Sequence, residues 1–117
     1  MLRRKETIQE ARSDYDWGAM YWLGNQEIGN TKGLSMATMV MKPGAVGVSH
    51  HHPNCEEVLY LIKGRLEHHI GDEVIVQEPG DFVTIGAHVS HHAINIADED
   101  AEVIIAFSSA ARTFVPE

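Results

Sequence analysis

The sequence contains a single cysteine, Cys55, which excludes a framework of internal disulfides. It also lacks any apolar run approaching the roughly 18 residues that a membrane-spanning helix needs. Basic residues are few: nine lysines and arginines stand against 17 acidic residues, for a net charge of −8. Nucleic acids and anionic membrane surfaces both require a basic face, so we expect neither as a partner.

The first residues, MLRRKETIQEAR, are basic but have no apolar segment behind them, as a secretory signal would. We therefore expect a cytoplasmic, reducing location. Of the 117 residues, 44% are hydrophobic and 22% are charged. This composition and length fit one soluble domain with a single core.

Short β-type segments, separated by Gly, Pro, Asn and Asp, fill most of the chain. No segment shows a 3.6-residue apolar period long enough for an extended helix. The pattern is typical of an all-β sandwich or barrel. The strands that we predict lie at residues 17–23, 34–42, 46–52, 57–62, 65–70, 74–77, 82–85, 91–96 and 102–107.

The N-terminal third is less regular than the rest. Residues 7–12 fit either a short helix or a loose strand, and residues 24–33, rich in Gly and Asn, indicate a loop. Both tryptophans and two of the three tyrosines fall between Tyr15 and Trp22. This aromatic window predicts a strand that packs on the barrel or covers one end of it. The alternative is a subunit contact, because exposed aromatic residues mark interfaces.

All eight histidines lie within residues 50–92, and three of them are consecutive. Imidazole is the usual ligand for transition metals near neutral pH, and carboxylate is its common partner. Residues two apart on a strand share a face. His50 and His52 should therefore point the same way, and His51 the opposite way.

Two later residues can complete a metal site. Glu57 begins the strand after the Pro53 turn, where its carboxylate can fold back beside His50 and His52. His91 stands on a later strand that a barrel could place alongside. Three imidazoles and one carboxylate would suit one divalent ion of Mn, Fe, Co, Ni, Cu or Zn, with one or two positions left open for water or substrate.

The spacing of these residues is more specific than their clustering. The stretch GAVGVSHHHPNCEEVLYLIKG fits the first cupin motif through Gly44, His50, His52, Glu57 and Gly64. A second motif follows through Gly80, His91 and Asn95. Two turn positions depart from the family, which usually has Pro where Gly86 stands and Gly where His88 stands. Over residues 34–108 the chain resembles a small single-domain cupin.

That resemblance implies an all-β, antiparallel jelly-roll barrel with a metal near its centre. It assigns the metal to His50, His52, Glu57 and His91. It also divides the chain into an N-terminal segment (1–33), the barrel (34–108) and a tail (109–117).

Lys63-Gly64 predicts a two-residue hairpin with positive φ at the glycine. In the register of a type I′ turn, Leu59 lies opposite His68, and partners across a strand pair share a face. His68 would then point inward with Glu57, as a candidate catalytic acid, base or substrate-orienting residue. The alternative is a hydrogen-bonded histidine against the barrel wall.

The remaining histidines and two residues near Glu57 carry smaller predictions. Three histidines are expected to face away from the site: His51, His69 and His92. His88, in the loop before His91, could line the mouth of the barrel. Glu56 could exchange roles with Glu57 if a bulge shifts the strand. Cys55 is predicted to be a plain loop thiol, with a redox or fifth-ligand role as the less favoured alternative.

A divalent metal with an open position can activate dioxygen or polarise a carbonyl, carboxylate or enolate. Cupins are variously dioxygenases, decarboxylases, isomerases and lyases, and the fold does not choose among them. The resemblance therefore implies a metalloenzyme of one of these types, acting on a small oxygen-rich organic substrate, and a homodimer. The alternatives are a non-catalytic metal- or ligand-binding sensor or accessory subunit, and a dimer in which the metal only stabilises the barrel.

Overall fold

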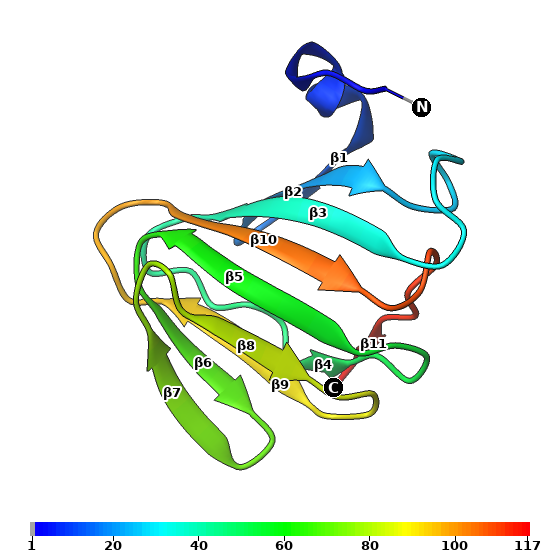
Figure 1. The fold of residues 1–117 in the computed structure, drawn as a ribbon. Coiled ribbons are helices and arrows are strands. Elements are labelled where there is room, and N and C mark those ends of the chain that lie inside the picture. Colours follow the sequence, from blue (N-terminus) through cyan, green and yellow to red (C-terminus); the bar gives the residue numbers. More distant parts are fainter. Residues whose placement is uncertain (1) are drawn as a thin grey trace.

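The computed structural model describes residues 2–117, which form two antiparallel sheets. The six-stranded sheet has the order β1-β2-β3-β10-β5-β8, and the five-stranded sheet has the order β11-β4-β9-β6-β7 (Figure 1). One short 3-10 helix, η1 (Lys5–Ala11), precedes them. The strands are β1 (Arg12–Tyr15), β2 (Gly18–Gly24), β3 (Ser35–Met41), β4 (His50–His51), β5 (Glu57–Lys63), β6 (Leu66–Ile70), β7 (Glu73–Gln77), β8 (Phe82–Ile85), β9 (His91–Asn95), β10 (Ala101–Phe107) and β11 (Val115–Pro116).

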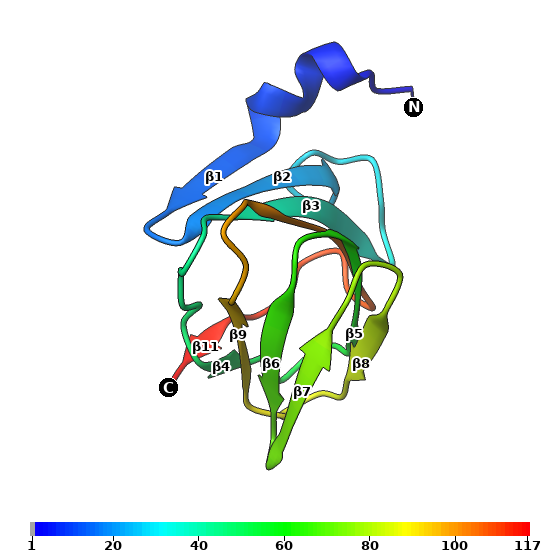
Figure 2. The same cartoon turned by 90° about the vertical axis from the view of Figure 1, so that its left-hand side faces the viewer.

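Viewed along its axis, the molecule shows the strands of the two sheets arranged as a ring, with η1 outside it (Figure 2). Inward-facing apolar side chains from both sheets form one buried cluster. The alternation is clear on β5, where Leu59 and Leu61 are buried while Val58 and Tyr60 are exposed. The fold is therefore the predicted all-β, antiparallel jelly-roll barrel.

One predicted strand is largely wrong. Residues 46–52 were expected to form a continuous strand, but only His50–His51 does so, and Val46 makes an isolated bridge to Ile94. Gly47 lies so close to β9 that a Cβ there would be 3.2 Å from the Ala93 carbonyl oxygen. The segment therefore follows an irregular path along β9 instead of forming a regular ladder.

The predicted β5–β6 hairpin is also wrong. β5 pairs with β10 and β8, whereas β6 pairs with β7 and β9, so Leu59 does not lie opposite His68. Gly64 does have the expected positive φ, of 98°. A Cβ at Gly64 would lie 2.9 Å from the Cα of Ala101, so the glycine lets the chain pass from one sheet to the other.

Both ends of the chain join the sheets. β2 pairs with β3, so the aromatic N-terminal segment extends the six-stranded sheet. β11, which the sequence did not predict, pairs with β4 beside the histidine cluster. None of the helices in the described residues is both long and apolar enough to span a membrane.

Candidate metal centre

Four side chains from three strands meet inside the barrel. His50 lies on β4 and His52 follows it, while Glu57 and His91 are the first residues of β5 and β9. His50 and His91 are direct neighbours across the β4–β9 pair. One ligand atom from each of the four residues lies within 4.8 Å of all the others. The structure thus brings together the four residues predicted as ligands.

The alternation expected along the triple histidine holds. His52 is buried, whereas His51 lies on the other side, where its Nδ1 is 2.5 Å from a carboxylate oxygen of Glu117. The ambiguity between the two glutamates is also resolved. Glu57 is buried, and Glu56, which precedes the strand, is exposed.

Each ligand histidine is oriented by the backbone. Nδ1 lies 2.6 Å from the Val48 carbonyl oxygen in His50 and 2.8 Å from the Val89 carbonyl oxygen in His91. In His52 it lies 2.8 Å from the carbonyl oxygen of Thr113. A carbonyl only accepts, so Nδ1 carries the proton and donates it. When such a ring is neutral, its Nε2 carries a lone pair, which is the form that binds a metal.

The atoms at the centre lack partners of their own. Glu57 Oε1 lies 3.3 Å from His52 Nε2 and 2.9 Å from His91 Nε2. These three atoms are buried and have no hydrogen-bond partner of acceptable geometry among the described residues. Unpaired buried polar atoms are costly. A shared cation would satisfy all three at once, so the donor set fits a transition metal.

The electrostatics of the cluster favour an ionised carboxylate. Burial opposes the charge on Glu57, but the adjacent imidazoles of His52 and His91 outweigh it and lower the Glu57 pKa to about 2. Burial likewise opposes charge on His91, and the neighbouring Glu57 carboxylate more than compensates and raises the His91 pKa. Burial lowers the pKa of His50 to about 4. The site therefore holds one fixed negative charge among its imidazoles.

A cavity of about 380 Å³ adjoins the four residues. His68 lines this cavity and is buried, so the predicted inward direction is right, although the pairing used to predict it is not. Its Nδ1 lies 2.7 Å from Gln77 Oε1, and burial lowers its pKa. His68 is not one of the clustered ligands; it stands beside them, with its ring centre 6.5 Å from that of His91.

The remaining histidines are not part of the ligand cluster. His69 and His92 stack on each other, with ring centres 4.4 Å apart, and neither pairs directly with His68. His92 nevertheless contributes to the cavity lining, so the prediction that it faces away from the site is wrong in that respect. His88 is exposed and has a φ of 68°, the conformation that the glycine usual at this cupin position adopts easily. It is absent from the cavity lining, which leaves the predicted place at the mouth unsupported. Cys55 is buried and does not join the ligand cluster.

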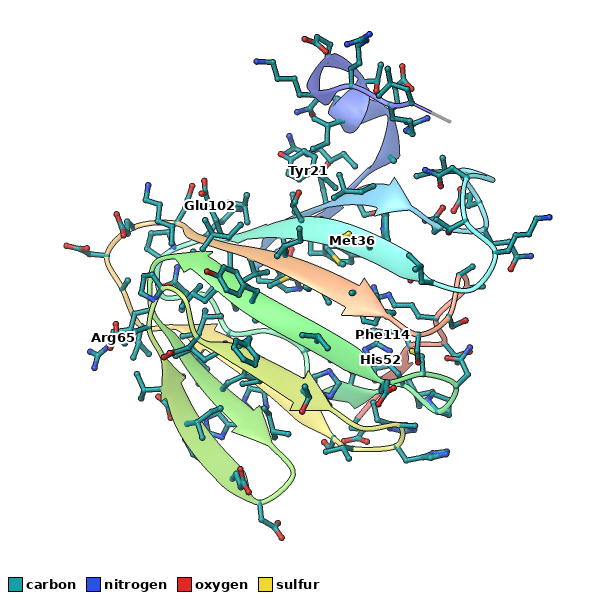
Figure 3. All side chains as sticks on the ribbon, viewed as in Figure 1. Tyr21, Met36, His52, Arg65, Glu102 and Phe114 are labelled. Carbon is teal, nitrogen blue, oxygen red and sulfur yellow. The ribbon has the colours of Figure 1, made fainter. Side chains whose placement is uncertain are left out.

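Sequence reasoning missed the contribution of the C-terminal segment. Besides the Thr113 carbonyl, this segment supplies Phe114, whose ring stacks on His50 with centres 4.3 Å apart. His52 and Phe114 lie together at one end of the barrel in Figure 3. The segment also brings Arg112 to the cavity. The sequence offered one sign of this contribution: Arg112 and Phe114 are large side chains in a tail of mostly small or polar residues.

Comparisons with known proteins find relatives in sequence and in fold. A Streptomyces cyaneus protein called polyketide synthase CurC is 31% identical over 84 residues, which is 72% of this chain and 54% of the relative. The Arabidopsis thaliana germin-like protein subfamily 3 member 2 is 30% identical over 80 residues, which is 64% of this chain and 35% of the relative. A solved structure of Bacillus subtilis oxalate decarboxylase, described for its Mn(II) centres, matches with a TM-score of 0.84 at 22% identity.

That match covers 93% of this chain and 30% of the decarboxylase chain. The chain thus spans about half the length, or less, of the proteins that it resembles. The sequence model of the family described as "Cupin domain" matches residues 37–107, which is more than half of the chain. The chain belongs to the cupin family.

Proposed function

We propose that this protein is a mononuclear metalloenzyme that acts on a small organic substrate in the barrel cavity. One observation carries the proposal. One ligand atom from each of three backbone-oriented histidines and from the Glu57 carboxylate lies within 4.8 Å of the others, at the wall of a cavity of about 380 Å³. A buried set of this kind, open to a ligand-sized space on one side, is the arrangement expected of a catalytic site.

His50, His52, Glu57 and His91 would hold the ion. A divalent transition metal bound there would supply Lewis-acid polarisation of a substrate oxygen and, for a redox metal, a position for dioxygen. Manganese is the ion that we propose first. Three imidazoles and one carboxylate accommodate it, and the matching decarboxylase structure is described for Mn(II) centres.

His68 is the proposed proton acceptor. Gln77 Oε1 can only accept, so the contact with Gln77 fixes the proton of His68 on Nδ1. Nε2 then carries a lone pair, and burial keeps the ring neutral by lowering its pKa. A neutral imidazole beside the cavity can take a proton from a substrate hydroxyl or carbon acid and return it later. This role suits decarboxylase, isomerase, lyase and dioxygenase chemistry alike.

The test compares His68→Asn with His69→Asn, neighbouring residues on opposite faces of β6. Metal-loaded proteins are screened against small enols, hydroxy acids and dicarboxylates, with oxygen uptake and carbon dioxide release measured separately. We expect His68→Asn to lower kcat by about 10²- to 10⁴-fold. Metal content should not change, and His69→Asn should retain full activity.

Two results would count against the proposal. Equal turnover by both variants would remove His68 from the mechanism. A protein that binds metal but turns over nothing in the panel would favour the alternative, a non-catalytic metal- or ligand-binding module.

A further inference from the structure

Arg112 is a cation at the cavity wall without an acidic partner. Its guanidinium carbon lies 5.1 Å from the ring centre of Trp22, 5.0 Å from that of Phe107 and 5.4 Å from that of Phe114. Its only side-chain hydrogen bond within residues 2–117 is a 3.7 Å contact with Met20 Sδ, a weak acceptor. No ion pair joins Arg112 to any carboxylate in those residues. The exposed Arg65, by contrast, forms an ion pair in which its Nε lies 2.7 Å from Glu78 Oε1.

Partly burying an unpaired guanidinium costs free energy, and the contacts with the three aromatic rings offset only part of that cost. Burial lowers the pKa of Arg112, because the charged form is taken from water without full compensation. Cation–π contacts use the face of the group and leave its N–H donors without an oxygen acceptor. A planar oxyanion offers the two acceptors that this fork matches.

The charges around the cavity point to a single negative group on the ligand. Of the described residues that line the cavity, Glu57 is the one with a carboxylate and Arg112 the one lysine or arginine, beside five histidines and Tyr15. A metal ion would occupy the carboxylate of Glu57. Arg112 is then left as the cationic group available to a ligand, in a chain whose net charge is −8. An anion inside the cavity would have no competing carboxylate from the protein.

Apart from the histidines, the rest of the lining is mainly apolar and includes four aromatic side chains. Tyr15 and Trp17 stack in parallel at 4.7 Å, and Phe107 and Phe114 also face the cavity. Aliphatic and methionine side chains form further parts of the wall: Met20, Met39, Met41, Val48, Leu59, Ala93 and Ile105. A compact dicarboxylate such as oxalate has no apolar surface to place against these residues. A flat apolar body does, since aromatic rings favour stacked or edge-on contacts.

We infer that Arg112 binds the carboxylate of the substrate, and that the substrate is a monocarboxylic acid with a planar, apolar body. This inference rests on the proposed function, because it names the substrate class of the same cavity. It makes Arg112 a substrate-binding residue rather than a structural one. It also separates this pocket from one built for a small dianion.

The test measures binding directly, with cinnamate, cinnamamide and oxalate as probes. Calorimetric titration gives each Kd for the wild type, Arg112→Met and Arg112→Lys, in both metal-free and metal-loaded protein. Arg65→Met is the matched control, because Arg65 lies outside the cavity and far from Phe114 (Figure 3). Line broadening of cinnamate protons by bound Mn(II) reports whether the probe lies near the metal.

We expect wild-type protein to prefer cinnamate to cinnamamide even without metal, and to bind oxalate more weakly than cinnamate. Losing a charged hydrogen-bond partner should weaken cinnamate binding about 10- to 100-fold in Arg112→Met, with cinnamamide nearly unaffected. Arg112→Lys keeps the charge, so its affinity for cinnamate should fall less. If Arg112→Met does not fold, the result for Arg112→Lys decides the question. Arg65→Met should bind like the wild type.

The inference is overturned if Arg112→Lys and Arg112→Met bind cinnamate like the wild type. It is also overturned if the wild type does not distinguish acid from amide, or if Mn(II) does not broaden the probe. Metal content measured on the same samples separates this failure from failure of the proposed function. A protein that binds metal but lacks the carboxylate preference refutes only the role of Arg112.

Discussion

Replacing Glu57 by glutamine should destabilise the metal-free protein. Glutamine keeps the size of the side chain but removes the charge that faces His52 and His91. The pKa of Glu57 lies at about 2 in the folded chain, against an ordinary value of 4.5. A carboxyl with a lowered pKa contributes stability above its unfolded pKa, and this contribution is lost as the pH falls through the folded pKa.

The size of the effect follows from that pKa difference. At about 1.4 kcal/mol per pH unit, the interval between 4.5 and about 2 corresponds to about 3 kcal/mol at neutral pH. The raised pKa of His91 reports the same interaction from the other side, so it is not added again. Glu56→Gln, an exposed neighbour, should change the free energy of unfolding by less than about 0.5 kcal/mol.

Urea denaturation of chelator-treated protein measures both variants. At pH 7, Glu57→Gln should unfold with a free energy about 3 kcal/mol lower than the wild type, at an unchanged m-value. The gap should close as the pH falls from about 4.5 towards 2, where the wild-type carboxylate takes up its proton. Equal stability of Glu57→Gln and Glu56→Gln at neutral pH would refute an ionised Glu57 that is stabilised by the adjacent imidazoles.

Two further predictions concern stability. Burial lowers the pKa of His68, so the unfolded chain binds the proton first, and stability falls as the pH drops below about 6.5. His68→Asn should reduce the slope of unfolding free energy against pH by at most about 1.4 kcal/mol per pH unit. A slope that stays unchanged in urea denaturation would contradict this prediction. Gly64→Ala should cost about 1–3 kcal/mol more than Gly80→Ala in the same assay. Both have positive φ, but only at Gly64 would the Cβ meet backbone.

The alternation of side chains along strands made the site largely predictable. It depends only on the local geometry of a strand, so it placed His50 and His52 inside and His51 outside without any knowledge of the fold. Glu57 and His91 required the spacing of two motifs, because nothing local says which later strand lies beside β4. The family pattern supplied that long-range information.

Pairing was not predictable from the same signals. Lys63-Gly64 has the sequence typical of a tight hairpin turn. The chain there instead passes from β5 in one sheet to β6 in the other, with Gly64 close to the backbone of Ala101. A two-residue connection with positive φ serves either purpose, and only the packing against β10 distinguishes them. The prediction that His68 points inward is still right. More and less buried side chains alternate along most of β6, and this alternation does not depend on which strand β6 pairs with.

The C-terminal contribution was beyond sequence reasoning for a different reason. β11 has two residues and no hydrophobic alternation to detect. The contact with His52 uses the backbone carbonyl of Thr113, which any residue could provide. The roles of Arg112 and Phe114 can be recognised only once the fold shows that both residues line the cavity.

The most direct test of the metal centre is the metal content of His52→Asn compared with His51→Asn. These adjacent histidines face opposite sides of the same segment, so the pair controls for local sequence and expression. Elemental analysis of protein purified without chelator should find one transition-metal ion per chain in the wild type and in His51→Asn. His52→Asn should have lost most of its metal. Equal metal in both variants, or negligible metal in all three proteins, would contradict a metal site formed by His50, His52, Glu57 and His91.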